Sequence, residues 1–467
     1  MTAFIFLLVT FLAVGFAWEM RGDLIGGEEG AMFPGAILGL CISLFVPVSG
    51  LKEFFFLPMA LGMIGMFFGG TETYAETFDF TYYGKTLKDK PDNLRHGLAG
   101  LSLKGAPWFG ICASVLAVGI KAFSNENPYK WYELVILVVL IPVARILGIK
   151  IFNSPFDFEK KIFPKFYFSK ERKEEWGGLL FINALFLIFT LVKKDWFSVI
   201  IIAFGTVGGA ISWVIAQMAH SLTKTKNRKG KYFFGKLQEK GYIDNWKLME
   251  FLFGALGSVF IALGFVVQKN SLNEIFTDKQ KIYGSDKALL IAFIVLFFVD
   301  AILNLFMKKN KTVMKIKNII HRPIVCYVPM LFIFLGVYRA AIFSILVVLV
   351  WQPLEELVFY QLYKADLDVK LTAVIDYIFI AIMTFVSLAV TPANFFAAGR
   401  INQMIVFICL SVEYIICASL WNIIRHMHIN NENSIIKSVK EMKSFQSVKI
   451  NYLLCVIISA VLMADFS

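Results

Sequence analysis

The stretch ALLIAFIVLFFVDAILNLF, from Ala288 to Phe306, decides the fold class of this protein. Its 19 residues include a single charged side chain. As an α-helix they would extend about 28 Å, close to the thickness of the hydrocarbon core of a bilayer. Comparable runs recur along the 467-residue chain, which is 58% hydrophobic and only 17% charged, whereas soluble proteins are about 25% charged. The sequence therefore predicts an all-α, polytopic bundle of transmembrane helices.

The charge of the loops indicates how often the chain crosses the membrane. Apolar runs predict about 14 spans, within a range of about 12–14. Lysine and arginine concentrate in five loops, which all fall on one side if there are about 14 spans, as expected for cytoplasmic loops. We therefore expect a multi-pass protein of the cell membrane, of the type found in the bacterial inner membrane. The basic loops are 70–105, 150–177, 220–247, 308–322 and 422–447. The predicted spans are 2–17, 31–49, 54–69, 106–121, 132–149, 178–192, 196–219, 248–268, 287–307, 323–337, 340–353, 371–391, 402–421 and 448–464.

The glycines divide the chain into two parts, because 30 of the 33 lie at or before Gly264. Glycine in a membrane helix allows two backbones to approach closely, and it also permits broken helices that line a cavity. We predict a glycine-rich transmembrane half over 1–269 that carries the functional site. The bulky apolar half over 270–467 is expected to be a scaffold or the surface of a homo-oligomer.

The segment between the first two spans concentrates charge beside hydrocarbon. It reads WEMRGDLIGGEEGAMFPGAILGL from Trp18 to Leu40. An ionisable group at mid-bilayer costs about 2.5–3.5 kcal/mol, so such residues are candidates for function. We expect Asp23 to cap a short turn and Pro34 to lie in the first turn of a helix, after a loop that folds back into the membrane. The alternative is an ordinary acidic loop. The candidate site residues of this segment are Glu19, Arg21, Asp23, Glu28 and Glu29.

Two carboxylates follow the third span. Glu72 and Glu76 share one face if residues 69–77 are helical. Such a pair could bind a cation, relay protons or act as an acid/base pair. The alternative is a solvated helix end that happens to carry two glutamates.

Two cationic candidates, His96 and Lys104, are expected just before the fourth span. The position favours an interfacial role, in which the ammonium group of Lys104 reaches the lipid headgroups beside a tryptophan. The alternative is that both residues form the cationic side of a site whose anionic side is Glu28, Glu29 and Glu72.

Glu250 is the last candidate, in the first turns of the eighth span. It is expected to pair with Lys247, three residues earlier on the same helix.

Several classes of function are excluded by absent patterns. The six cysteines all fall in apolar spans without a Cys-x-x-Cys pair, and the five histidines are scattered, so neither a metal site nor a cofactor is expected. The net charge of +12 resides largely in the basic loops, where anionic lipid headgroups account for it without nucleic acid. The chain also lacks Gly-x-Ser-x-Gly, P-loop and His-Glu-x-x-His motifs.

These patterns favour a transporter or flippase. Its substrate would be small or lipid-linked and anionic, and buried carboxylates would couple its movement to protons or another cation. The first alternative is a membrane-embedded enzyme acting on a lipid or lipid-linked substrate, so whether the protein is an enzyme stays open. The second alternative is a non-catalytic scaffold. The expected partners are membrane lipids and the substrate.

Overall fold

The computed structural model describes residues 2–24, 27–45, 55–72, 74, 77, 92–124, 127–169, 172–224 and 244–275, with isolated positions at 329, 330, 333, 341 and 345. Within these ranges the protein is helical and has no β-strand, only an isolated bridge between Asp157 and Ile162. The helices are α1 (Ala3–Leu24), α2 (Gly27–Phe45), α4 (Phe56–Gly69), α7 (Asp92–Ala122), α8 (Trp131–Phe152), α9 (Trp176–Val192), α10 (Trp196–Lys224), α12 (Asn245–Val267) and α13 (Lys269–Ile275).

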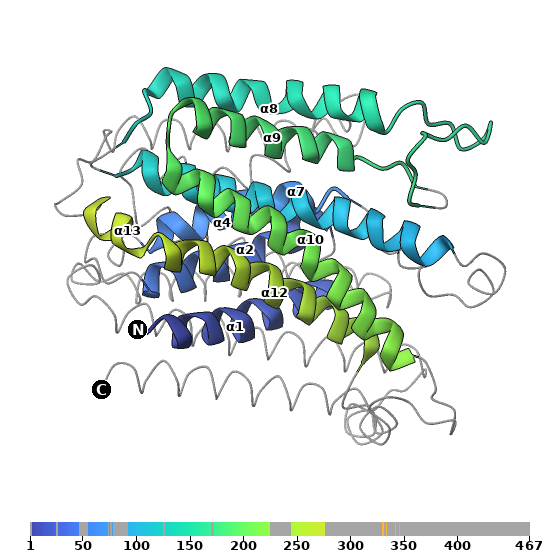
Figure 1. Cartoon of the computed structure of the whole chain (residues 1–467), viewed down its shortest axis with the longest axis horizontal. Coiled ribbons are helices and arrows are strands. Elements are labelled where there is room, and N and C mark those ends of the chain that lie inside the picture. The colour runs from blue at the N-terminus through green and yellow to red at the C-terminus, as the bar shows by residue number, and fades with distance from the viewer. Residues whose placement is uncertain are drawn as a thin grey trace, which may run out of the picture.

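Six of these helices pack against one another in a closed ring of pairwise contacts, and Figure 1 shows them running along the bundle. Around the ring, α1 packs against α2, α2 against α4, α4 against α7, α7 against α10 and α10 against α12, which returns to α1. α9 packs on the outside of this ring against α7, and α8 lies beyond α9 along one edge of the bundle. Most residues of the hydrophobic core of the described chain belong to these six helices.

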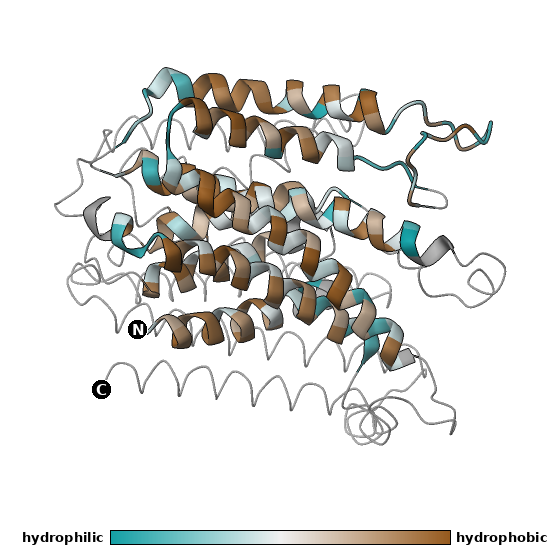
Figure 2. Ribbon diagram, viewed as in Figure 1, coloured by the Kyte–Doolittle hydropathy of each residue, from teal (hydrophilic) through white to brown (hydrophobic). Residues whose placement is uncertain are grey.

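The helices are apolar along most of their length (Figure 2). In the described part of the chain, four helices are long and apolar enough to cross a membrane, and four shorter apolar helices accompany them. The outermost helix, α8, exposes apolar side chains such as Trp131, Val139 and Ile146. An exposed apolar surface is stable in lipid, so the fold is that of a membrane-embedded helix bundle. The long apolar segments are Arg95–Ala122, Trp131–Phe152, Trp196–Thr223 and Asn245–Val267; the shorter ones are Ala3–Glu19, Gly30–Phe45, Phe56–Gly69 and Trp176–Val192.

Each of the first eight predicted spans overlaps one of these helices. The six predicted spans from 287 onward, and the stretch Ala288–Phe306 among them, lie outside the described residues apart from a few isolated positions. The count of about 14 spans and the division into 1–269 and 270–467 therefore stay predictions.

Two expectations about helix boundaries were wrong. The fourth helix was expected at 106–121, but α7 begins at Asp92, so His96 and Lys104 lie within the helix rather than before it. α1 continues to Leu24 and α2 begins at Gly27, so most of the acidic segment belongs to two helix ends instead of a loop. Buried backbone needs intrahelical hydrogen bonds, which favours helix over loop wherever these segments pack in the core.

Pro34 was also misplaced, since it lies inside α2 rather than in its first turn. α2 starts directly after residues 25 and 26, with Gly27 at a φ of 68°. This left-handed conformation favours glycine, and it allows a new helix to start shortly after the previous one.

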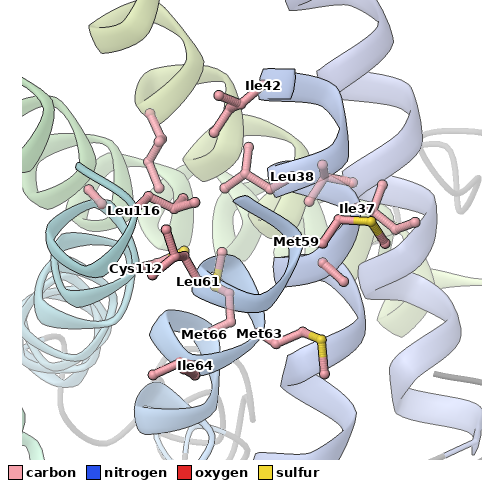
Figure 3. Packing of buried hydrophobic residues seen from close by; sticks show 14 of the residues in the cluster. Ile37, Leu38, Ile42, Met59, Leu61, Met63, Ile64, Met66, Cys112 and Leu116 are labelled. Atoms are coloured by element: carbon pink, nitrogen blue, oxygen red, sulfur yellow. The ribbon is translucent and has the colours of Figure 1, made fainter. Parts of the chain in front are cut away.

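Glycine–glycine crossings hold the ring together. A Cβ atom added to Gly35 of α2 would lie 2.1 Å from the carbonyl oxygen of Gly62 in α4, and one added to Gly62 would lie 2.0 Å from the oxygen of Gly35. Around this crossing the side chains of α2, α4 and α7 interdigitate, among them Leu38, Leu61 and Cys112 (Figure 3). The prediction that glycines allow close helix approach is confirmed here.

Candidate functional site

Seven helices bring their ends or outer turns together at one end of the bundle. The last turns of α1, α4 and α10 lie there with the beginnings of α2, α9 and α12 and the first half of α7. The predicted site residues whose side chains are described belong to this end.

Lys104, Glu72 and Glu174 form a buried ionic group that we name the Lys104 cluster. The Nζ atom of Lys104 lies 3.1 Å from Oε1 of Glu72 and 2.8 Å from Oε1 of Glu174, and each of these side chains is at most 1% exposed. The ammonium also donates to Oγ1 of Thr77 at 2.9 Å. Buried charges persist when they are paired and hydrogen-bonded, as they are here.

Three segments of the chain supply the Lys104 cluster. Glu72 follows the end of α4, and its carboxylate accepts the backbone N–H of Glu175 at 2.8 Å. Glu174 precedes α9, and its carboxylate accepts the N–H of Phe168 at 3.1 Å and the hydroxyl of Ser169 at 2.9 Å. The cluster therefore fastens the end of α4 and the segment before α9 to the middle of α7.

The charges of the Lys104 cluster do not balance. With all three groups ionised, two carboxylates face one ammonium and the net charge is −1. Burial raises the pKa of Glu72; the ammonium of Lys104 opposes this shift, and the charge of Glu174 adds to it. One proton on a carboxylate would make the cluster neutral.

Tyr74 and Glu250 form a second polar contact between distant parts of the chain. The hydroxyl of Tyr74 donates to Oε1 of Glu250 at 2.9 Å, and only 2% of Glu250 is exposed. The ring of Tyr74 packs between Trp213, at 4.8 Å between centroids, and Trp246, at 6.0 Å. Burial, with the carboxylate of Glu250, raises the pKa of Tyr74, so the phenol keeps its proton and remains the donor.

Arg21 lies at the junction of α1 and α2. It is only 4% exposed, and its Cζ atom lies 5.0 Å from the centre of the Trp18 ring and 5.3 Å from that of Trp108. Its Nη2 donates to the carbonyl oxygen of Gly27 at 3.2 Å. Within the described part of the chain, the buried Nε and Nη1 atoms have no hydrogen-bond acceptor.

Two glycines make room for the tryptophans around Arg21. A Cβ atom on Gly69 would lie 1.9 Å from Cδ1 of Trp108, and one on Gly254 would lie 2.4 Å from Cβ of Trp18. Trp108 is further fixed by donating from its indole nitrogen to the carbonyl oxygen of Met66 at 3.1 Å. The glycine-rich half of the chain thus allows large aromatic side chains between closely packed helices.

The predicted partners are brought together only in part. Lys104 meets Glu72, as in the alternative interpretation of Lys104 given above. His96 is exposed, its Nε2 donates to the carbonyl oxygen of Tyr167 at 2.8 Å, and its ring packs against Phe168 at 4.7 Å between centroids. Glu72 and Glu76 were expected to share one face if residues 69–77 are helical. α4 ends at Gly69, so Glu72 is not part of a helix.

Lys247 and Glu250 each have a partner in a distant part of the chain. Nζ of Lys247 lies 4.0 Å from Oε1 of Glu19 on α1, whereas Glu250 accepts the hydroxyl of Tyr74. The side chains of the remaining candidates lie outside the described residues: Asp23, Glu28, Glu29 and Glu76.

Two residues of this region were not among the predicted candidates. Glu174 stands beside Glu175 just before the Trp176-Gly177-Gly178 start of α9, and this acidic pair was the available signal. Tyr74 lies in the Gly69–Thr77 segment, where the two glutamates drew attention instead.

In the described ranges, no group of three or more histidine, cysteine, aspartate or glutamate side chains is placed to hold a metal ion. Glu72 and Glu174 converge on the ammonium of Lys104 in the position where a cation would otherwise bind.

Comparison with known proteins does not assign this chain to a family. No family model matches it, and neither the curated proteins nor the solved structures contain a match.

Proposed function

We propose that the protein is a multi-pass membrane transporter or flippase that moves a small or lipid-linked anionic substrate, with proton coupling through the Lys104 cluster. Membrane lipids and this substrate are its partners, and the chain crosses the cell membrane about 14 times. The single observation that carries the proposal is the charge imbalance of the Lys104 cluster, in which one buried ammonium is shared by two buried carboxylates.

A proton supplies the missing charge. A second buried carboxylate beside a single ammonium is costly in a low-dielectric environment, which favours binding of one proton. Burial already raises the pKa of Glu72 in this direction. The proton would weaken the hold of Lys104 on one carboxylate, and hence the fastening of α4 or of the segment before α9 to α7. A local charge change of this kind is a common origin of conformational switching.

The test measures which compounds of a whole-cell extract are taken up by sealed proteoliposomes. A proton gradient is imposed across the membrane of these vesicles. Lumen and membrane are then analysed by mass spectrometry for wild type, Glu72→Gln and Glu159→Gln. Glu159 is the matched control, because it is an exposed glutamate on the loop before α9 and undergoes the same substitution. We expect a compound to accumulate unchanged in wild-type and Glu159→Gln vesicles and not in Glu72→Gln vesicles.

Two results would overturn the proposal. Equal gradient-driven accumulation in Glu72→Gln and wild-type vesicles would show that the Lys104 cluster does not couple transport to protons. A compound that is chemically altered by wild type alone would establish the alternative, a membrane-embedded enzyme acting on a lipid or lipid-linked substrate.

A further inference from the structure

We infer that Arg21 and Trp18 form a binding site for an oxyanion group, a carboxylate or a phosphate, at the junction of α1 and α2. The inference identifies the charged group of the substrate in the transporter proposed above, and in that respect it rests on the proposed function. Anion binding itself is measurable without transport.

Arg21 and Trp18 carry buried hydrogen-bond donors that have no acceptor in the described chain. Nε and Nη1 of Arg21 and Nε1 of Trp18 are inaccessible to solvent, and none of them has an acceptor among the described residues. Trp18 is fully buried, and the guanidinium of Arg21 lies over its ring. Guanidinium and indole groups donate hydrogen bonds and cannot accept them. A ligand that satisfies these groups must therefore present acceptor atoms.

No described carboxylate neutralises the charge of Arg21 by an ion pair. Glu19 is two residues earlier on α1, so it projects about 200° away around the helix, and its carboxylate faces Lys247. Glu250, on α12, accepts the hydroxyl of Tyr74. An anionic ligand would supply the missing negative charge.

Arg21 differs in its partners and burial from the two other cations predicted for the site. Lys104 is held between two carboxylates, and its charge is already over-compensated. His96 is exposed and donates to a backbone carbonyl group. Arg21 is thus the one of these three cations that combines burial with nitrogen atoms lacking an acceptor in the described chain.

The surroundings of Arg21 suit an oxyanion. The rings of Trp18 and Trp108 fix the plane of the guanidinium by cation–π contacts, and the carbonyl oxygen of Gly27 holds Nη2. An arginine held in this way loses little side-chain freedom on binding, and its planar donors match the geometry of carboxylate and phosphate oxygens.

The experiment measures thermal unfolding of the purified full chain in a neutral detergent. Sodium phosphate, sodium acetate or sodium chloride is added at equal ionic strength. A ligand that binds the folded state raises the melting temperature in a saturable manner. We expect phosphate or acetate to do so in wild type, with chloride as the baseline. Nanodiscs of phosphatidylcholine with and without phosphatidic acid then distinguish a lipid phosphate from a free anion.

Three variants test the assignment to Arg21 and Trp18. Arg21→Gln should lose the response, whereas Arg95→Gln, the same change at an exposed arginine of α7, should retain it. If Arg21→Gln fails to fold, Trp18→Phe provides the test. It keeps a ring under the guanidinium but removes one donor, and it should weaken anion binding by about fivefold.

The inference is overturned if wild type responds to none of phosphate, acetate and phosphatidic acid. It is also overturned if Arg21→Gln, or Trp18→Phe where the first variant does not fold, responds like wild type. Glu72→Gln should keep the anion response. Lost proton coupling with an intact anion response would therefore leave this site in place, and an absent anion response would leave the coupling test unaffected.

Discussion

Single side chains at this end of the bundle connect segments that are far apart in the sequence. Lys104 connects the chain after α4 with the segment before α9, and Tyr74 connects the same turn with α12. In both contacts a carboxylate that would be costly to bury alone has a nearby donor. The stability of the fold and the chemistry of the candidate site therefore depend on the same few residues.

Replacing Lys104 by methionine should be strongly destabilising. The variant removes the ammonium that the buried carboxylates of Glu72 and Glu174 share, and removing one partner of a buried ion pair costs about 3–5 kcal/mol. Chemical unfolding in detergent measures the change in the free energy of unfolding. The control is Lys160→Met, because the Lys160 side chain is 75% exposed and its Nζ atom lies 3.4 Å from Oδ2 of Asp157. This change should lower the free energy of unfolding by less than about 1 kcal/mol. Similar losses in the two variants would contradict a buried ionic cluster.

The raised pKa of Glu72 predicts a pH dependence of stability. Between the usual value of 4.5 and the raised pKa, the folded protein retains a proton that the unfolded chain has released. This contribution is fully present below pH 4.5 and is lost as the pH rises through the raised pKa. Wild type should therefore lose stability relative to Glu72→Gln over this window. Melting temperatures of both proteins at a series of pH values check it, and a constant difference would argue against the raised pKa.

At the scale of elements, glycine determines how closely the helices of the ring approach. In the crossing of α7 with α10, a Cβ atom on Gly209 would lie 2.1 Å from the carbonyl oxygen of Gly105, and one on Gly105 would lie 2.3 Å from that of Gly209. Because these contacts are made with backbone oxygens, they cannot be relieved by the movement of a side chain. Such crossings explain why glycine is concentrated in the half of the chain that forms the ring.

Gly209→Ala should separate α7 from α10 and destabilise the protein. Overpacking a tight contact costs about 1–3 kcal/mol. Gly264→Ala is the matched control, because its Cβ atom would lie 3.1 Å from Cα of Ile201, a crowded contact but much longer than the 2.1 Å at Gly209, and the better helix propensity of alanine offsets this crowding by about 1 kcal/mol. We expect a lower melting temperature for Gly209→Ala and little change for Gly264→Ala. The reverse order would show that the crossing is not tight.

At the scale of the whole molecule, the described helices have two chemically different ends. One end carries the Lys104 cluster and Arg21. At the other end, Tyr129 donates to Asp195 and Lys193 pairs with Glu133, which joins the start of α8 to the turn after α9. The basic loops predicted to be cytoplasmic adjoin the first end, so the candidate site is expected to face the cytoplasm.

Cysteine labelling of intact cells tests this orientation. In a background without the six native cysteines, Lys130→Cys should react with a membrane-impermeant maleimide. Lys160→Cys should react only after permeabilisation, because it lies in the loop at the opposite end of α8 from Lys130. Both positions are exposed, so accessibility within the protein does not bias the comparison. Labelling of Lys160→Cys alone in intact cells would reverse the proposed orientation.

The sequence by itself determined the class of protein and the positions of its first eight helices. Long apolar runs, basic loops and glycine content are local properties, and each reflects the cost of placing a residue in lipid or water. The same reasoning suggested that Lys104 and Glu72 belong to one site. It failed at helix ends, where packing in the core extended α1 and α7 beyond their apolar runs.

Only the tertiary structure decided which charged residues meet. Tyr74 and Glu250 are 176 positions apart, and Arg145 finds its partner in Glu175 on the other side of a long loop. The structure also separated Arg21, with nitrogen atoms lacking an acceptor in the described chain, from Lys104, which is neutralised. The physical reason is that an ion pair depends on distance in space. That distance follows from the packing of the whole ring, and no spacing along the chain encodes it.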